Sequence, residues 1–352
     1  MGLMSDATKP EPASVPKLMK AAFIRALGGP DDIKYADRPV PPPGPHEILL
    51  RMEAVAVNHV DLLVRSGAYV TGIDFPFTVG RDVVGTVVRC GAQVTGFQRG
   101  ERVWCNSLGH QNRQGSFSEY VLANDQRCYP LPIGVDAISA VSVLHGGATA
   151  FLGLVREAQV LPGELVVILG AGGAVGSIAV QLGLSMGCQI LAVAGAADIS
   201  GLTGLGAQRV FDYRDPGLAE KLFHEVGAGA KVVWNVSGTM PVNQQAQLLA
   251  VGGRIVHSAG IHGTQEIDTG YLYRRDISLL GFAISNASIE DLAAAATCLN
   301  GLFAGPGIAT RVGKILPLSQ SAHAHRMLET QTRHQLGGKI VLVPDSSVLH
   351  SR

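Results

Sequence analysis

The sequence lacks an excess of charge of either sign. Lysine and arginine number 28, aspartate and glutamate also number 28, and charged residues make up only 16% of the 352 positions. A protein that holds nucleic acid by its phosphates needs a basic surface, and this balance does not supply one. We therefore expect no nucleic-acid partner, and a small molecule as the ligand.

Paired cysteines are also missing. Cys90, Cys105, Cys128, Cys188 and Cys298 stand apart, and no two of them have the C-x-x-C spacing. This arrangement supports neither a disulfide framework nor a zinc ribbon. It is typical of a protein in a reducing compartment, so we expect a cytoplasmic location.

No apolar run approaches the length of about 20 residues that a membrane-spanning helix needs. The most apolar region, residues 164–196, is interrupted by glycines. Residues 1–17 are polar and contain prolines, without the apolar segment of a signal peptide. We predict a flexible N-terminal tail at 1–17 and no association with a membrane.

The pattern of the remaining chain predicts two domains, which 352 residues with 47% apolar content can build. Up to about residue 137, short alternating or apolar runs are separated by glycine- and proline-rich turns, as in a β-barrel or sandwich. Beyond it, strands and helices alternate through about residue 284, which predicts a doubly wound parallel sheet. The tail is mixed, with helices expected at 288–303 and 318–331.

The segment "VVILGAGGAVGSIAVQLG", residues 166–183, carries the main motif. The pattern G-x-G-x-x-G fits if Ala171 takes the first position, so that Gly173 and Gly176 take the others, and Gly170 and Gly172 add flexibility. An apolar strand leads in and a helix leads out, which is the context of a dinucleotide-binding loop. We expect the phosphates of a cofactor at this helix N-terminus, against Ala171, Gly172, Gly173, Ala174, Val175 and Gly176.

The residues after the next strand bear on the type of cofactor. NAD-binding domains usually place an acid about 20 residues beyond the loop, to bind the ribose 2′-hydroxyl. Here that strand ends at Gly195, and the first acid, Asp198, lies beyond its end. The segment "AGAADISGLTGLG" has no lysine or arginine, and Tyr213 is among the nearest polar candidates. We predict NADP(H), with NAD(H) as the alternative.

Several segments in order, "AVAVNHVDLLVRSGAY", "FPFTVGRDVVGTVV", "GSFSEYV", "HGGATAFLGL", "LGAQRVFDYR" and "LGGKIVLVP", resemble the medium-chain dehydrogenase/reductase superfamily. Within it, the resemblance is to the zinc-free branch of quinone oxidoreductases and enoyl reductases, and it covers about residues 18–345. It implies an α/β protein with a GroES-like β-barrel substrate domain and a Rossmann cofactor-binding domain. The implied boundaries are 18–137 and 285–345 for the substrate domain and 138–284 for the Rossmann domain. The family also implies a homodimer formed through the nucleotide domain.

The resemblance also bears on metal chemistry. Zinc-dependent members place three ligands at positions that here hold Asn58, Arg81 and approximately His145. A catalytic zinc site needs three such ligands and an open fourth position, so we predict no metal site. Without a Lewis acid, the alkoxide of an alcohol substrate has no stabilising group, whereas reduction of a polarised double bond needs only hydrogen-bond donors and a proton.

The sequence thus predicts an NADPH-dependent oxidoreductase that transfers hydride to a quinone or an α,β-unsaturated carbonyl. Tyr69 resembles the proton-donating tyrosine of enoyl thioester reductases, and Asn58 is a candidate to orient the nicotinamide ribose or the substrate carbonyl. The second tyrosine of many quinone reductases is replaced by leucine at 62–63. Asp61 and Arg65 are an alternative structural ion pair.

Other cofactor contacts are expected at strand ends, where doubly wound sheets bind ligands. Thr149 resembles a threonine near the nicotinamide, and Lys339 is a candidate for the 2′-phosphate. The remaining candidates are Gly195, Tyr213, Ser237, Ala259, Gly260, Ile261, Phe282 and Ala283. Two alternatives stay open: an alcohol dehydrogenase-like enzyme with relocated metal ligands, and a non-catalytic nucleotide-binding relative, like the lens crystallins of this superfamily.

Overall fold

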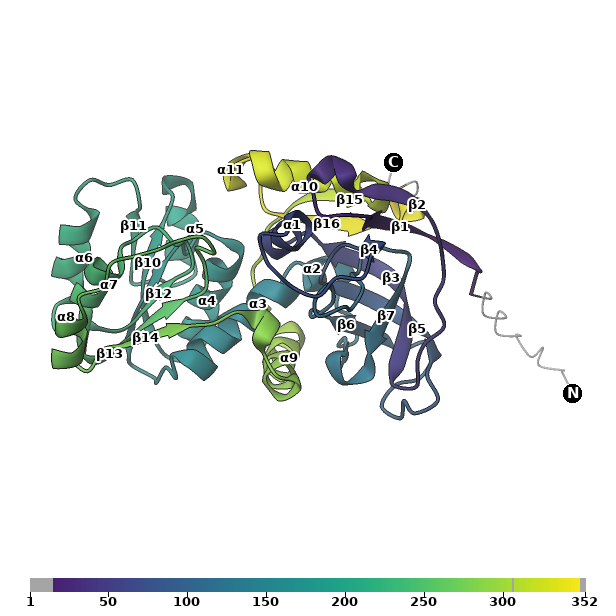
Figure 1. Ribbon diagram of the computed structural model, residues 1–352. Helices are drawn as coiled ribbons and strands as arrows, with labels where there is room; N and C mark the ends of the chain where they lie inside the picture. Colours follow the sequence, from purple (N-terminus) through teal and green to yellow (C-terminus); the bar gives the residue numbers. More distant parts are fainter. Residues whose placement is uncertain (1–14, 306, 349–352) are drawn as a thin grey trace, which may run out of the picture.

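A computed structural model of the chain describes residues 15–305 and 307–348, so most of the tail expected at 1–17 lies outside the described residues. The chain forms two lobes (Figure 1). The middle of the sequence, in teal and green, builds one lobe, and the two ends of the described chain, in purple and yellow, lie together in the other.

The first lobe contains a parallel sheet of six strands in the order β11-β10-β9-β12-β13-β14. Their bounds are β9 Leu165–Leu169, β10 Gln189–Ala194, β11 Arg209–Asp212, β12 Ala230–Asn235, β13 Leu249–His257 and β14 Ser278–Gly281. Read along the chain, this is the order 3-2-1-4-5-6 of the Rossmann fold. The central strand β9 is buried at four of its five residues, as expected of a parallel strand with both faces covered.

Helices connect these strands. They are α4 Ala174–Ser185, α5 Ile199–Gly204, α6 Leu218–Val226, α7 Val242–Gln247 and α8 Thr269–Arg274. The topological switch point of such a sheet lies where the connections reverse direction, between β9 and β12, and ligands bind there at the carboxyl ends of the strands. The glycine loop follows β9 at this point.

The second lobe is mostly β. Its larger sheet has the order β15-β16-β3-β5-β6-β8, with β7 paired to β3, and its smaller sheet has the order β2-β1-β4. The bounds are β1 Leu18–Ile24, β2 Lys34–Pro39, β3 Glu47–Ala56, β4 Phe77–Thr78, β5 Val83–Cys90, β6 Arg102–Cys105, β7 Tyr120–Asn124, β8 Tyr129–Pro130, β15 Val312–Pro317 and β16 Lys339–Val343. Residues Val341 and Leu342 of β16 pair with Ala56 and Val55 of β3, so the last strand joins this sheet. The fold is therefore the expected GroES-like substrate domain combined with a Rossmann domain.

The helices around this lobe are α1 His59–Ser66, α10 Ser321–Thr330, α11 Arg333–Leu336 and α12 Asp345–Val348, and α2 Ala137–Val141, α3 Leu144–Phe151 and α9 Ile289–Ala304 lie where the lobes meet. One hydrophobic core runs from Ala54 in β3 through α3 to Trp234 in β12, so apolar packing continues from one lobe into the other. The buried indole of Trp104 donates to Asn300 Oδ1 of α9 over 2.9 Å. The lobes are therefore joined by packed side chains.

Two segments of the chain are irregular. Helix α3 is followed directly by a π-helical segment, Leu152–Glu157. In β13, Leu249 pairs with Ala230 but Arg254 pairs with Val232, so the extra residues between them bulge out of the ladder, with Gly252 at φ +73°.

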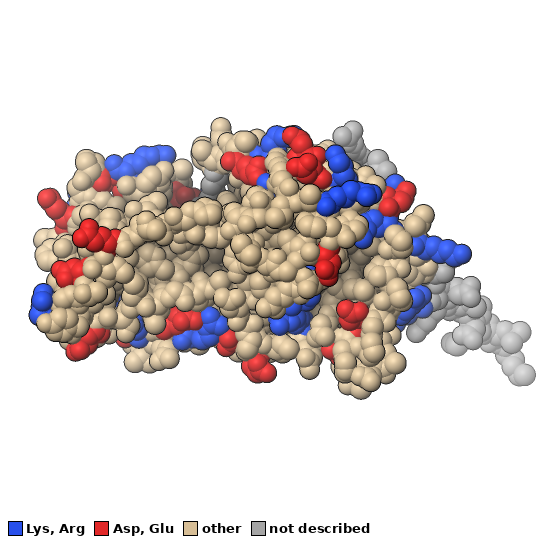
Figure 2. All heavy atoms as spheres, in the orientation of Figure 1, with Lys and Arg blue, Asp and Glu red and all other residues tan. Residues whose placement is uncertain are grey.

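The surface shows no region of one charge on the face drawn in Figure 2, where basic and acidic side chains alternate. This agrees with the balanced composition of the sequence. None of the helices within 15–305 and 307–348 has the length and apolar character needed to cross a membrane.

Candidate active site

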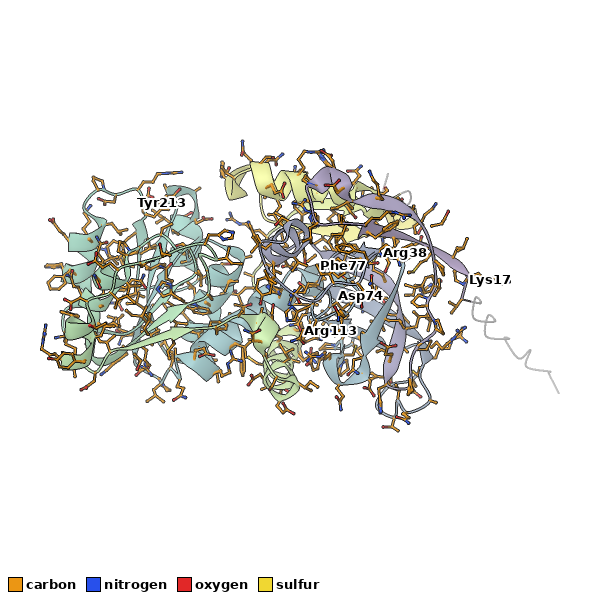
Figure 3. All side chains as sticks on the ribbon, viewed as in Figure 1. Lys17, Arg38, Asp74, Phe77, Arg113 and Tyr213 are labelled. Carbon is orange, nitrogen blue, oxygen red and sulfur yellow. The ribbon has the colours of Figure 1, made fainter. Side chains whose placement is uncertain are left out.

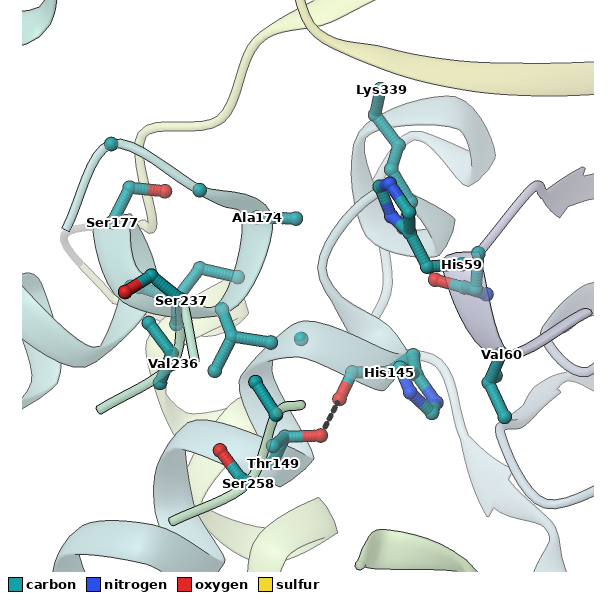
Figure 4. Close-up of a pocket in the computed structure, with 18 of the residues that line it drawn as sticks. His59, Val60, His145, Thr149, Ala174, Ser177, Val236, Ser237, Ser258 and Lys339 are labelled. Carbon is teal, nitrogen blue, oxygen red and sulfur yellow. Dashed lines mark hydrogen bonds between the residues drawn. The ribbon is translucent and has the colours of Figure 1, made fainter. Parts of the chain in front are cut away.

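A cavity of about 930 Å³ lies between the lobes. One wall is formed by the N-terminal turn of α4 and the carboxyl ends of β12, β13 and β14, and the other by α1 and the start of β16. Figure 4 shows these walls, with Ser177 and Ser237 on one side, His59 and Lys339 on the other, and His145 and Thr149 between them. The volume is within the range of small-molecule and cofactor sites.

At two positions of the glycine loop, a residue with a Cβ would not fit the backbone conformation or the space available. Gly170 has φ +87°, so it is required for the turn and does not merely add flexibility, as the sequence suggested. A Cβ at Gly176 would lie 2.3 Å from the Gly170 carbonyl oxygen and 2.7 Å from the Ala171 Cα. Gly173 is the N-cap residue of α4. The first turn of α4 therefore packs directly on the loop, and its unpaired N–H groups face the cavity end of the sheet.

Most of the expected cofactor residues line the cavity. They are Thr149, Gly172, Gly173, Ala174, Val175, Gly176, Ser237, Ala259, Gly260, Ile261, Phe282, Ala283 and Lys339. Three do not, namely Ala171, Gly195 and Tyr213. Ala171 is fully buried, because its N–H donates to the Val193 carbonyl over 2.9 Å and its side chain joins the core.

Tyr213 lies at the upper edge of the first lobe in the view of Figure 3, with 54% of its surface exposed. Its ring is near Gly195, where an added Cβ would lie 3.5 Å from Tyr213 Cε1, and Arg214 covers the ring at 4.9 Å. Both residues follow their strands at the end of the cavity that Asp198 and α5 line. They flank the cavity without lining it, and their role as cofactor contacts stays a prediction.

Arg311 is a cavity residue that sequence reasoning missed. It comes from the segment before β15, yet a Cβ at Gly201 of α5 would lie only 3.7 Å from its Nη2. The guanidinium has no hydrogen bond or ion pair with any described residue, whereas the Arg311 carbonyl accepts from the Lys339 N–H over 2.7 Å. The segment after β10 has no lysine or arginine of its own, and the guanidinium beside it comes from a residue more than 100 positions later in the chain. No local pattern in the sequence marks it.

A network of buried polar groups lies at the opposite end of the cavity. Lys339 Nζ donates to Asn58 Oδ1, and Asn58 Nδ2 donates to Asp82 Oδ2 over 2.9 Å. The Asn58 N–H donates to Asp61 Oδ2 over 2.8 Å, which caps α1. The Asn58 amide is therefore engaged within the protein, and the Lys339 ammonium lies against it. The role of Lys339 at a 2′-phosphate stays a prediction.

The two carboxyl groups of this network are strongly perturbed. Burial raises the pKa of Asp61 to about 6 and that of Asp82 to about 7, and nearby cations, Lys339 and Arg81 among them, oppose both shifts. Burial also lowers the pKa of Lys339, against the attraction of the same two carboxylates. Clustered perturbed groups in a cleft are typical of functional sites.

Tyr69 and His145 line the cavity near this network. The Tyr69 ring meets His110 edge-on at 5.9 Å, and its hydroxyl has no hydrogen-bond partner among the described residues. Burial lowers the pKa of His145 far below its usual range, and the positive charges of Arg81 and Lys339 lower it further. The imidazole is therefore neutral. The Thr149 hydroxyl donates to the His145 carbonyl over 2.8 Å, which leaves its oxygen able to accept (Figure 4).

The structure decides two further points. Arg65 pairs with Glu329 of α10, so the alternative of an Asp61–Arg65 ion pair is wrong; Asp61 caps α1 instead. The described parts of the chain contain no group of three or more histidine, cysteine, aspartate or glutamate side chains arranged to hold a metal ion.

Comparison with known proteins agrees with this architecture. The alcohol dehydrogenase GroES-like domain family matches residues 44–133, and the zinc-binding dehydrogenase family matches residues 174–300. The quinone oxidoreductase of Mus musculus is 30% identical over 314 residues, which cover 88% of this chain and 93% of that protein. The chain therefore belongs to the medium-chain dehydrogenase/reductase superfamily, in the branch of the quinone oxidoreductases.

Solved structures show the same relationship. A mycobacterial quinone oxidoreductase superposes with a TM-score of 0.81 at 27% identity, over 93% of this chain and 100% of that one. An NAD-dependent alcohol dehydrogenase superposes with a TM-score of 0.81 at 29% identity, over 92% and 99% of the two chains. The protein is an oxidoreductase of this superfamily, whose members bind a nicotinamide cofactor.

Proposed function

We propose that the protein uses NADPH to reduce a quinone or an α,β-unsaturated carbonyl compound and that it needs no catalytic zinc. The observation that carries this proposal is one continuous cavity that joins the glycine loop of α4 to Tyr69 and Lys339. The name of the mouse relative, quinone oxidoreductase, supports the class of acceptor.

The residues present fit a dinucleotide. The tight packing at Gly176 leaves the N–H groups of the first turn of α4 available to phosphate oxygens. Thr149 offers a hydrogen-bond acceptor in the middle of the cavity, where it suits a carboxamide. When bound, the reduced nicotinamide supplies the hydride. We propose that Asn58 acts indirectly, by holding Lys339 in position, since its own amide is already engaged.

Arg311 supports the choice of NADPH. Its unpaired guanidinium lies over α5, directly after β10, where the cofactor's adenosine ribose lies in Rossmann domains. Arginine binds phosphate through two parallel hydrogen bonds, which suits a 2′-phosphate. The alternative cofactor is NADH. It is supported by Asp198, which lines the same end of the cavity, because an acidic side chain binds the ribose 2′-hydroxyl in NAD-binding domains.

The proton that completes the reduction is assigned to Tyr69. Its hydroxyl lacks a partner among the described residues and belongs to a side chain that lines the cavity. A neutral imidazole also donates one N–H, and we propose that His145, which lines the cavity, holds the substrate oxygen in this way without supplying a proton.

The experiment that tests this function is a comparison of NADPH and NADH oxidation with a panel of quinones and enones. We expect turnover with NADPH and a lower Kd for NADPH than for NADH. Tighter binding of NADH would refute the choice of cofactor, and the absence of turnover with every acceptor would favour a non-catalytic relative. The second candidate is an alcohol dehydrogenase, the name of one structural neighbour; stoichiometric zinc in the purified protein would favour it.

We also propose that the protein is a homodimer formed through the nucleotide lobe. Strand β14 is the last strand of the Rossmann sheet, and Leu279 on it is 39% exposed, which supports pairing between two copies. Light scattering gives the mass in solution, and a monomer would contradict this proposal. The cytoplasmic location stays a prediction.

A further inference from the structure

Two of the cysteines that stand apart in the sequence lie opposite each other in the substrate lobe. Cys105 is the last residue of β6, and Cys128 comes directly before β8. These strands are antiparallel, and Trp104 lies opposite Tyr129. The same register places Cys105 opposite Cys128, whose backbone is still extended, with φ −109° and ψ 143°.

The hydrogen bonds between these strands decide how close the two cysteines come. The Leu131 N–H donates to the Arg102 carbonyl over 2.9 Å, so these residues form a hydrogen-bonded pair. Such pairs alternate along an antiparallel ladder, which makes Cys105 and Cys128 a non-hydrogen-bonded pair. The Cys128 N–H accordingly donates to the Asp125 carbonyl, over 3.2 Å, and not to β6. The Cα atoms of such a pair are about 4.5 Å apart, within the range of about 4.4–6.8 Å that a disulfide spans.

Both side chains point to the same side of the strands. Cys105 and Cys128 belong to the apolar core inside the β lobe, whereas Trp104 and Tyr129 pack in the core that continues into the other lobe. The Cys128 thiol donates a hydrogen bond to the Cys105 sulfur, which lowers the pKa of Cys105 to about 7 although burial opposes the shift. Burial raises the pKa of Cys128 well above its usual value. Cys105 is therefore the group that carries thiolate, the reactive form of cysteine.

We propose that Cys105 and Cys128 form a reversible disulfide when the protein meets a peroxide. The Cys105 thiolate attacks one peroxide oxygen, the O–O bond breaks, and hydroxide leaves a sulfenic acid behind. The Cys128 sulfur then attacks the Cys105 sulfur, the S–O bond breaks, and the disulfide forms. The two thiol protons and both peroxide oxygens leave as two molecules of water, so the thiols lose two electrons and the peroxide gains them. This inference does not depend on the reductase function.

The position of Cys128 decides how the oxidation ends. A sulfenic acid with no thiol beside it is open to irreversible oxidation to a sulfinic acid, whereas a disulfide is reversed by thiol exchange. Cys105 is fully buried and Cys128 is 5% exposed, so a peroxide, which is little larger than water, suits the site better than a bulky disulfide. Cys188 is also 5% exposed, but its thiol donates to the Leu161 carbonyl over 3.7 Å. The cross-strand pair thus protects Cys105 from irreversible damage.

Peptide mapping of the full chain without reductant tests the proposal. Trypsin cleaves after Arg113 and Arg127, which places the two cysteines in separate peptides, 103–113 and 128–156. After treatment with hydrogen peroxide and blocking of the remaining thiols, we expect these two peptides to be linked, with the loss of two hydrogen atoms in mass. Dithiothreitol should separate them again. If both thiols persist, or if either cysteine is linked to a different one, the proposal is wrong.

Variants test the role of Cys128. Cys128→Ser should lose the linked peptides, and peptide 103–113 should gain the mass of two oxygen atoms, which dithiothreitol does not remove. Cys128→Ala replaces this variant if circular dichroism shows that the serine variant does not fold. Cys188→Ser, the matched control at equal exposure, should form the same linked peptides as the wild type. Oxidation of Cys105 that stays fully reversible without Cys128 would overturn the pairing.

Discussion

Replacement of Gly176 by alanine tests how closely the cofactor loop is packed. The added Cβ would lie 2.3 Å from the Gly170 carbonyl oxygen, so the loop and α4 must separate by about 1 Å to reach ordinary contact. The neighbouring atoms belong to backbone, which gives way less readily than the end of a side chain. Overpacking of this kind costs about 1–3 kcal/mol, and alanine returns about 1 kcal/mol through helix propensity. We expect Gly176→Ala to lower the free energy of unfolding by about 1 kcal/mol, the difference between these two contributions.

Two other glycines serve as controls. Gly301 lies in α9, where an added Cβ would meet nothing within 4 Å, so Gly301→Ala should stabilise the protein by about 1 kcal/mol. Gly183 lies in α4 itself, and there the Cβ would lie 2.9 Å from Cδ1 of Ile190, the flexible end of a side chain. Gly183→Ala should therefore fall between the other two variants.

Urea unfolding followed by circular dichroism gives the three free energies, and fluorescence titration gives the Kd of NADPH. Displacement of the loop misaligns the N–H groups of α4, so Gly176→Ala should also weaken NADPH binding by about 10–100-fold. The controls should bind normally. If Gly176→Ala is as stable as Gly301→Ala and binds NADPH as well as the wild type, the loop is not a tightly packed phosphate site.

Three further predictions concern single side chains. Arg311→Gln should raise the Kd of NADPH by about 10–100-fold and leave that of NADH unchanged, as isothermal titration would show, because only NADPH carries the 2′-phosphate; equal effects on both would contradict the assignment. Tyr69→Phe should lower kcat by about 10²–10⁴-fold with little effect on NADPH binding, whereas an unchanged kcat in stopped-flow assays would leave the proton donor elsewhere. Burial lowers the pKa of His325 to about 3, so the unfolded chain binds a proton first and stability falls as the pH drops below about 6.5. His325→Leu should lose about 2 kcal/mol less than the wild type between pH 7 and pH 5 in urea unfolding, and an equal loss would show that this histidine does not titrate as described.

The sequence by itself determined the elements and their class. The alternation of strands and helices after residue 137 predicted the Rossmann sheet, and β9 leads into the glycine loop as the pattern indicated. The glycine loop was identified by local chemistry, because Gly176 and Gly173 act through backbone within a few residues. Such features are readable since the interactions that fix them are short in sequence. The domain boundaries at 137 and 284 stay predictions.

The tertiary structure decided which distant side chains meet. Arg311 reaches α5, and Lys339 reaches Asn58. In each case the partners are separated by tens to hundreds of residues, and no periodicity relates them. The arginine that lines the α5 end of the cavity lies before β15, far along the chain from Gly195. The charge at a site depends on which side chains meet in space, whereas the sequence gives only their order along the chain. The set of residues that lines this cavity is therefore fixed by the packing of the two lobes.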